Sequence, residues 1–208
     1  MKYCPLLVLV ALLPLPAQTV PAQAVPAQPV PAQTYEPLTG EERLKWFAKT
    51  TYGPRSLFVS GPITAGWRTY KNYPEEWGPH WEGFGKRYGA RLLANSVTNG
   101  IEGSFGAIWK EDPRYFRVGE GSFGKRLGGV VKQTWMSRYG SGEYHFGAAK
   151  AIGIAGGALS QKLWLPDSVT SNRDVLSRLY GGYSGRILGN FIREFAPDLM
   201  KKLKKKKT

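Results

Sequence analysis

Residues 149–160, AKAIGIAGGALS, decide the fold class of this chain. Small residues recur there at positions i, i+4, i+7 and i+11. They are Ala149, Gly153, Gly156 and Ser160. This spacing follows one face of an α-helix and allows another backbone to approach closely. Small and apolar residues occupy both the odd and the even positions of this stretch, whereas a half-buried β-strand alternates apolar and polar residues. We therefore predict a close-packed helix over residues 144–163.

The same spacing recurs elsewhere in a chain that holds 26 glycines in 208 residues. The further positions are Ser96, Gly100, Gly103 and Ala107, then Gly182, Gly185 and Gly189, with shorter pairs at Gly85 and Gly89 and at Gly124 and Gly128. A glycine inside a helix costs up to ~1 kcal/mol relative to alanine, so close packing must offset the loss. The prediction is an all-α fold, a compact bundle of about five or six glycine-rich helices. Glycine-lined faces also favour a homo- or hetero-oligomer.

Helix boundaries follow from capping residues and prolines. Thr39 and Glu42 have the spacing of a capping box, which predicts a helix start. Longer helices are expected over residues 79–110, 122–139, 144–163 and 173–195. Asn172 is the expected cap of the last helix, and Pro166 and Pro197 are expected to mark breaks. The helical domain is therefore predicted to span residues 37–198.

The N-terminal region has the layout of a secretory signal. Lys2 precedes the apolar run LLVLVALL, and small residues follow, which predicts a signal peptide over residues 1–24, cleaved after residue 17 or 24. A proline-rich linker of repeated five-residue units is expected over residues 25–36. The single cysteine, Cys4, belongs to the signal, so the processed chain would hold no disulfide and no thiolate site.

Residue patterns of an enzyme are absent from the sequence. His80 and His145 are the only histidines, and neither belongs to a spaced metal-ligand motif. A match to the dinucleotide pattern at residues 119–124 has no preceding strand and no acidic residue at the required distance. The sequence therefore predicts no catalytic residue, no metal site and no cofactor, and it favours a non-enzymatic protein.

The densest polar group lies at residues 111–117, EDPRYFR. The guanidinium groups of Arg114 and Arg117 have the fork geometry that binds a carboxylate or phosphate. Anion-binding candidates are therefore Asp112, Arg114, Tyr115 and Arg117, with His145 as a proton carrier if the site were catalytic. The alternative is structural, and the sequence favours it. In that case the arginines pair with Glu111 or Glu102, and the aromatic rings fill the bundle.

Three motifs resemble a family of bacterial exported proteins. The motifs are YGAR at residues 88–91, DPRYFR at residues 112–117 and WLP at residues 164–166, together with the glycine-rich helix. The resemblance is to a GKRYG…DPRYFR…P layout and covers most of residues 38–202. It implies a single exported module. Together with the signal layout, this predicts a location in the periplasm or at an envelope membrane surface. It implies no catalytic residue.

The net charge of +14 is concentrated at the C-terminus. A polybasic tail over residues 199–208 carries Lys201, Lys202, Lys204, Lys205, Lys206 and Lys207. Lysines near an anionic bilayer stabilise binding by up to ~1 kcal/mol each, which predicts peripheral membrane association. A solvated tail without a partner is the alternative, and nucleic acid is not an expected partner of an exported protein.

The distribution of charged residues disfavours membrane-spanning helices. Beyond Glu36, the longest stretch without a charged residue covers residues 56–67, which is shorter than the ~20 apolar residues of a spanning helix. Shallow insertion of helices into a membrane surface is an alternative that this observation does not exclude. A small outer-membrane β-barrel is a further alternative, although residues 145–160 do not alternate as a barrel strand does.

Overall fold

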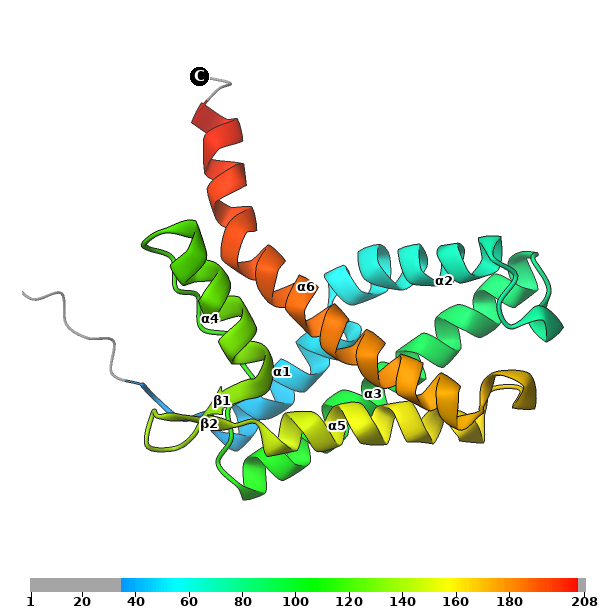
Figure 1. Cartoon of the computed structure of the whole chain (residues 1–208), viewed down its shortest axis with the longest axis horizontal. Helices are drawn as coiled ribbons and strands as arrows, with labels where there is room; N and C mark the ends of the chain where they lie inside the picture. Colours follow the sequence, from blue (N-terminus) through cyan, green and yellow to red (C-terminus); the bar gives the residue numbers. More distant parts are fainter. Residues whose placement is uncertain (1–34, 206–208) are drawn as a thin grey trace, which may run out of the picture. The chain divides into compact units, whose positions relative to one another are not determined.

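The computed structural model describes the backbone of residues 35–205 and the side chains of residues 35–203. Helices dominate this region, as predicted (Figure 1). The α-helices are α1 (Gly40–Tyr52), α2 (Gly61–Tyr70), α3 (Trp81–Ile108), α4 (Phe123–Trp135), α5 (Ala148–Ser160) and α6 (Asn172–Lys205). Shorter elements are the π-helix η1 (Arg55–Ser60), the 3-10 helices η2 (Glu75–Trp77), η3 (Gln161–Leu163) and η4 (Asp167–Val169), and the strands β1 (Met136–Arg138) and β2 (Tyr144–Phe146).

Several predicted segments lie outside the described residues. They include the predicted signal peptide and residues 25–34 of the predicted linker. Lys206 and Lys207 also lie outside, as do the side chains of Lys204 and Lys205, whose backbone belongs to α6.

Side-chain caps fix where two of the helices begin. The predicted capping box of α1 is confirmed, because Thr39 N donates to Glu42 Oε2 at 2.9 Å and Glu42 N donates to Thr39 Oγ1 at 3.3 Å. Helix α6 begins with a second capping box between Ser171 and Asp174, at 3.1 and 3.2 Å. The prediction that Asn172 caps this helix is wrong. Asn172 is its first residue, because Ser171 has the acidic partner three positions on that a capping box requires.

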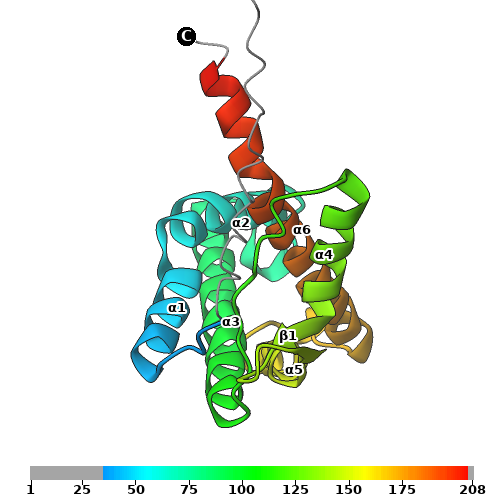
Figure 2. The same cartoon turned by 90° about the vertical axis from the view of Figure 1, so that its left-hand side faces the viewer.

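Helix α3 is the element on which most other helices pack. Helices α1 and α2 pack on it, and α5 packs against it from another side. Helix α6 then packs on α5, and α4 packs on α6 (Figure 2). Long α3 therefore links α1 and α2 to the C-terminal helices.

The glycine spacing predicts the α3–α5 contact correctly. A Cβ added to Gly153 would lie 2.8 Å from the carbonyl oxygen of Thr98 and 3.0 Å from Glu102 Cβ. A Cβ at Gly156 would lie 2.5 Å from the side chain of Ile101, and Gly157 faces Thr98 as closely. The two backbones approach closely because α5 lacks side chains on this face.

Other glycine stripes do not have this role in the described structure. A Cβ at Gly185 or Gly189 of α6 would meet no described atom within 4 Å, and the same holds for Gly85, Gly89, Gly124 and Gly128. Gly182 alone of the α6 set approaches a neighbour, the side chain of Ile154. Gly100 and Gly103 make only ordinary contacts, with Phe47 and Trp46. The prediction that every stripe mediates backbone contact is therefore wrong.

The segments predicted as helices over residues 122–139 and 144–163 are shorter than expected. Their facing ends form the antiparallel pair β1–β2, with Ser137 opposite His145. The chain reverses at Gly142, which has a φ of 84° that favours glycine. Asp112 N donates to the carbonyl oxygen of Arg138 at 2.8 Å, so β1 also holds the loop that follows α3.

Helix α6 continues through Pro197, so the predicted break there is wrong. Proline removes the hydrogen bond that its N–H would give to the preceding turn. In that turn the carbonyl oxygen of Glu194 accepts from Arg117 Nε at 2.9 Å and from Arg126 at 2.7 Å. These guanidinium donors bind the carbonyl next to that of Arg193, which the proline leaves without its helical donor.

Candidate functional site with a charged interior and an apolar exterior

The described interior is unusually rich in charged groups. Glu102, Glu111 and Glu194 are among its largest fully buried side chains, and Asp112 is also buried. The buried apolar residues are mostly small: Ala65, Val130, Ala149, Ile154, Ala158, Leu165, Val169 and Val175. Because a buried charge is costly unless it is paired and hydrogen-bonded, each of these groups requires partners.

Glu194 of α6 binds the loop that precedes α4. Its carboxylate accepts hydrogen bonds from Tyr115 Oη at 2.8 Å, Val118 N at 3.0 Å, Gly119 N at 2.9 Å and Arg126 Nε at 2.8 Å. Burial alone raises the pKa of this carboxyl, but the four hydrogen bonds outweigh burial and lower the pKa to about 2. Burial, followed by the hydrogen bond to Glu194, raises the pKa of Tyr115.

Asp198, one turn further along α6, completes this cluster. Its two oxygens accept from Arg117 and from Arg126, each at 2.6 Å. The hydrogen bonds from Arg117 and Arg126 lower the pKa of Asp198. The Arg126 guanidinium also lies 4.4 Å from the centroid of the Phe195 ring. The loop, α4 and α6 are thus joined through ion pairs, and the rings of Phe123 and Phe195, with centroids 5.2 Å apart, add an aromatic contact between α4 and α6.

A second buried pair joins α3 to α6. Both oxygens of Glu102 accept from the guanidinium group of Arg186. Lys150 of α5 lies nearby in the interior, and its ammonium donates to the carbonyl oxygens of Gln133 at 2.8 Å and Met136 at 3.0 Å. Burial and, next, the charge of Arg186 lower the pKa of Lys150 to about 8.

The lowered pKa of Lys150 predicts a pH dependence of stability. Above about pH 8 the folded protein releases this proton, whereas the unfolded chain keeps it up to about pH 10.5. The unfolded state then binds more protons, so the free energy of unfolding rises with pH from about pH 8. We expect urea unfolding of the wild type to show this rise and Lys150→Met to lose it. The exposed control Lys132→Met keeps the wild-type slope, and an unchanged slope in Lys150→Met would contradict the prediction.

The four predicted anion-binding residues separate into two clusters. Asp112 binds Arg114 in a bidentate pair, with Arg114 Nη2 at 2.7 Å and Nε at 3.0 Å from Oδ2, and it also accepts from Tyr35 Oη at 3.2 Å. Tyr115 and Arg117 point instead to Glu194 and Asp198 of α6. The loop residues therefore do not converge on one pocket.

Both loop arginines bind carboxylates of the chain itself, which supports their structural role. The expected partners are nevertheless wrong, because Arg114 pairs with Asp112 and Arg117 with Asp198. Glu111 accepts instead from Ala149 N at 2.9 Å, and Glu102 pairs with Arg186. Only the Arg114–Asp112 pair joins close neighbours in the sequence; the other pairs have members 38 to 84 residues apart, so nothing in the local sequence indicates them.

His145, the proposed proton carrier, belongs to exposed strand β2. Its Nε2 lies 3.5 Å from Glu143 Oε2, and its ring packs edge-on against Tyr139. Its partners are therefore residues of the same hairpin, and the structure does not place it with the loop arginines.

The exterior carries many large apolar side chains. The outward face of α5 holds Ile152 and Leu159, and Leu163 of the adjoining η3 is 85% exposed. On α6 exposed apolar residues include Leu176, Tyr180, Leu188, Leu199, Met200 and Leu203. A further group covers η1 and α2: Phe58, Val59, Ile63, Trp67 and Tyr70. Extended exposed apolar surface marks a contact with a protein or a membrane.

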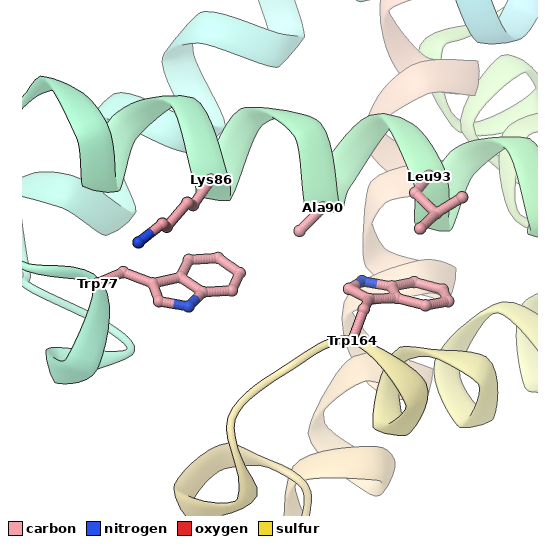
Figure 3. A pocket seen from close by; sticks show the side chains of 5 residues that line it. All are labelled: Trp77, Lys86, Ala90, Leu93 and Trp164. Carbon is pink, nitrogen blue, oxygen red and sulfur yellow. The ribbon is translucent and has the colours of Figure 1, made fainter.

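Two shallow hollows lie on the surface. One, of about 350 Å³, is lined by Trp77, Lys86, Ala90, Leu93 and Trp164, and Figure 3 shows the two indole rings beside the same face of α3. The other, of about 560 Å³, lies where Pro37 and Leu38 approach Trp109 and Tyr139. Neither gathers a set of groups suited to acid–base or nucleophilic chemistry.

The described region contains neither a metal-binding group of side chains nor a membrane-spanning helix. Among residues 35–203, no three His, Cys, Asp or Glu side chains are grouped to hold a metal ion. No helix within residues 35–205 combines the length and apolar content needed to cross a membrane. No family model matches the chain, and no match was found among curated proteins or among solved structures.

Proposed function

We propose that the chain is an exported, non-enzymatic protein of the bacterial envelope that attaches peripherally to an anionic membrane surface. The basic C-terminal end provides the attachment, and the close-packed helices α3 and α5 provide the scaffold. The signal-like N-terminus supports export. The compartment on this view is the periplasm or a membrane surface that faces it.

The C-terminal end of α6 is the observation that carries the proposal. Leu199, Met200 and Leu203 are each more than half exposed, and Lys201 and Lys202 lie beside them, also exposed. The sequence adds four more lysines over residues 204–207. A helix end that combines apolar residues with several lysines is suited to the boundary between lipid headgroups and acyl chains.

The charged interior supports a role other than catalysis. The carboxylates Glu102, Glu194 and Asp112 all bind arginines of the same chain. A catalytic acid or base must instead reach a substrate from a cleft. The buried charges thus hold helices and loops together, while the exterior is free to contact a partner.

Vesicle flotation tests the attachment. We expect the processed, exported protein to float with vesicles that contain phosphatidylglycerol and to remain behind with purely zwitterionic vesicles. Deleting residues 201–208 removes six lysines and should weaken binding on the order of a hundredfold at low salt. Because surface charges are screened, added salt should weaken binding of the wild type in the same direction.

A charge-preserving variant separates lysine charge from tail length. Replacing the six lysines by arginine should retain binding, and replacing them by glutamine should weaken it as strongly as the deletion does. Equal recovery with anionic and zwitterionic vesicles, together with no loss on deletion of residues 201–208, would contradict attachment through the tail.

A further inference from the structure

Five large apolar side chains form an exposed row along η1 and α2, here called the η1–α2 row. Its members are Phe58, Val59, Ile63, Trp67 and Tyr70. They recur every three or four residues from Val59 onward, so they occupy one side of the helix. Their exposed fractions run from 51% to 78%. The row covers roughly 18 Å along the axis, too short to cross a bilayer core of ~30 Å but suited to lie along its surface.

The opposite side of η1 and α2 is firmly packed on α3. Gly61 and Ala65 are buried there, and Tyr88 Oη of α3 donates to the carbonyl oxygen of Leu57 at 2.9 Å. Arg91 of α3 donates to Ser60 Oγ at 3.0 Å. The outward direction of the row is therefore fixed by contacts on the inner side.

The connection from α2 to α3 is also held in place. The buried guanidinium group of Arg87 donates to the carbonyl oxygens of Tyr73 at 2.8 Å, Pro74 at 2.6 Å and Gly78 at 2.6 Å. This arginine fixes the loop that follows the row, so the apolar surface belongs to a rigid hairpin.

The segment of chain that carries the row contains charges of one sign only. Residues 43–74 contain six lysines and arginines and no aspartate or glutamate. The Lys71 ammonium lies 5.1 Å from the centroid of the Trp67 ring and 5.6 Å from that of Tyr70. Tryptophan and tyrosine beside basic residues are typical of the headgroup level of a bilayer, where anionic lipids attract lysine and arginine.

Helix α2 and the C-terminal end of α6 lie toward the same side of the described structure. Both α2 and the last turns of α6 occupy the upper part of Figure 1 and of Figure 2, whereas α5 occupies the lower part of both. A membrane on the upper side would therefore face α2 and the lysine-rich end, with α5 on the other side.

We infer that the η1–α2 row is a membrane-insertion surface that takes the headgroup region of an anionic phospholipid bilayer. The row inserts its apolar side chains, and the surrounding basic residues contact the lipid phosphates. This inference rests on the proposed attachment and adds a second contact to it. Because insertion depends on apolar area rather than charge alone, the row contributes binding that added salt does not remove.

A fluorophore placed in the row tests the inference directly. Position 63 is changed to cysteine (Ile63→Cys) in the exported protein and labelled with an environment-sensitive dye. Phosphatidylglycerol vesicles should shift its emission to the blue. The matched control, Leu159→Cys on α5, should show no shift, and wild-type protein carried through the labelling reports any signal from Cys4.

A triple variant measures how much the row contributes. Phe58→Ser, Ile63→Ser and Trp67→Ser together should weaken vesicle binding on the order of a hundredfold, including at high salt. The control, Ile152→Ser with Leu159→Ser and Leu163→Ser on α5 and the adjoining η3, should leave binding unchanged. Circular dichroism checks that both variants stay folded.

The outcomes separate the row from the tail. Flotation with no blue shift at position 63 would overturn the row while the attachment through the tail stands. A blue shift of the dye emission that occurs without vesicles and disappears when the protein is diluted would show that a second protein copy covers the row. That result would overturn the assignment to lipid. Loss of flotation in all forms would overturn both proposals.

Discussion

Replacing Glu194 by alanine is expected to lower the free energy of unfolding by about 3–5 kcal/mol. The change removes the acceptor for Arg126, Tyr115 and two backbone N–H groups, and it leaves the guanidinium group without its buried partner. Helix α6 keeps the pairs of Asp198 with Arg117 and Arg126 but loses the buried carboxylate that binds the preceding loop and α4. Urea denaturation of the variant and of the wild type measures the difference.

Two comparisons show whether the loss comes from the buried carboxylate. Glu143→Ala alters an exposed carboxylate and should change stability by no more than ~0.5 kcal/mol. The pKa of Glu194 is about 2 when folded and near 4.5 in an unfolded chain, so its contribution is present above about pH 4.5 and is lost as pH falls toward 2. Glu194→Gln should lack this acid-dependent loss. A variant with the wild-type acid profile would argue against the assignment.

Gly153→Ala is expected to destabilise the protein by about 1–3 kcal/mol, although alanine favours helices. The new methyl group would lie 2.8 Å from the backbone carbonyl oxygen of Thr98 and 3.0 Å from Glu102 Cβ, so one of the two helices would have to shift. The close approach of α3 and α5 would then be lost. Thermal and urea unfolding both report the change.

Gly185→Ala is the matched control on α6. The added methyl group meets no described atom within 4 Å, so the variant keeps only the gain in helix propensity, up to ~1 kcal/mol. The two substitutions are therefore expected to have opposite signs. A loss of stability at both positions would show that Gly185 also faces a neighbour, and a gain at both would remove the packing argument for Gly153.

Local signals in the sequence predict the helices well. The capping box at Thr39 and the proline-bounded helix over residues 79–110 need only neighbouring residues to form. The spacing of Gly153 and Gly156 similarly predicts a face that another helix approaches. These features depend on helical periodicity, which a single sequence displays.

Long-range pairing explains what the sequence does not reveal. The β1–β2 hairpin shortens two predicted helices, and β1 bonds to Asp112 far from it in the chain. The α6 glycines have the same spacing as those of α5. The spacing indicates a helix face without large side chains, but it does not indicate whether another element packs on that face. In the sequence, Glu102 and Glu194 are indistinguishable from solvent-exposed carboxylates. Their burial depends on Arg186 and Arg126, which lie 84 and 68 residues away in the chain.

Asp198 is the last residue of α6 that takes part in a described ion pair between side chains. The turns that follow it carry the exposed apolar and basic groups of the C-terminal end. One continuous helix therefore divides into an inner portion that maintains the fold and an outer portion free to meet lipid. If the proposed attachment holds, shortening the outer portion should weaken membrane binding and leave the architecture intact, so that anchoring and folding would be separable properties of a single element.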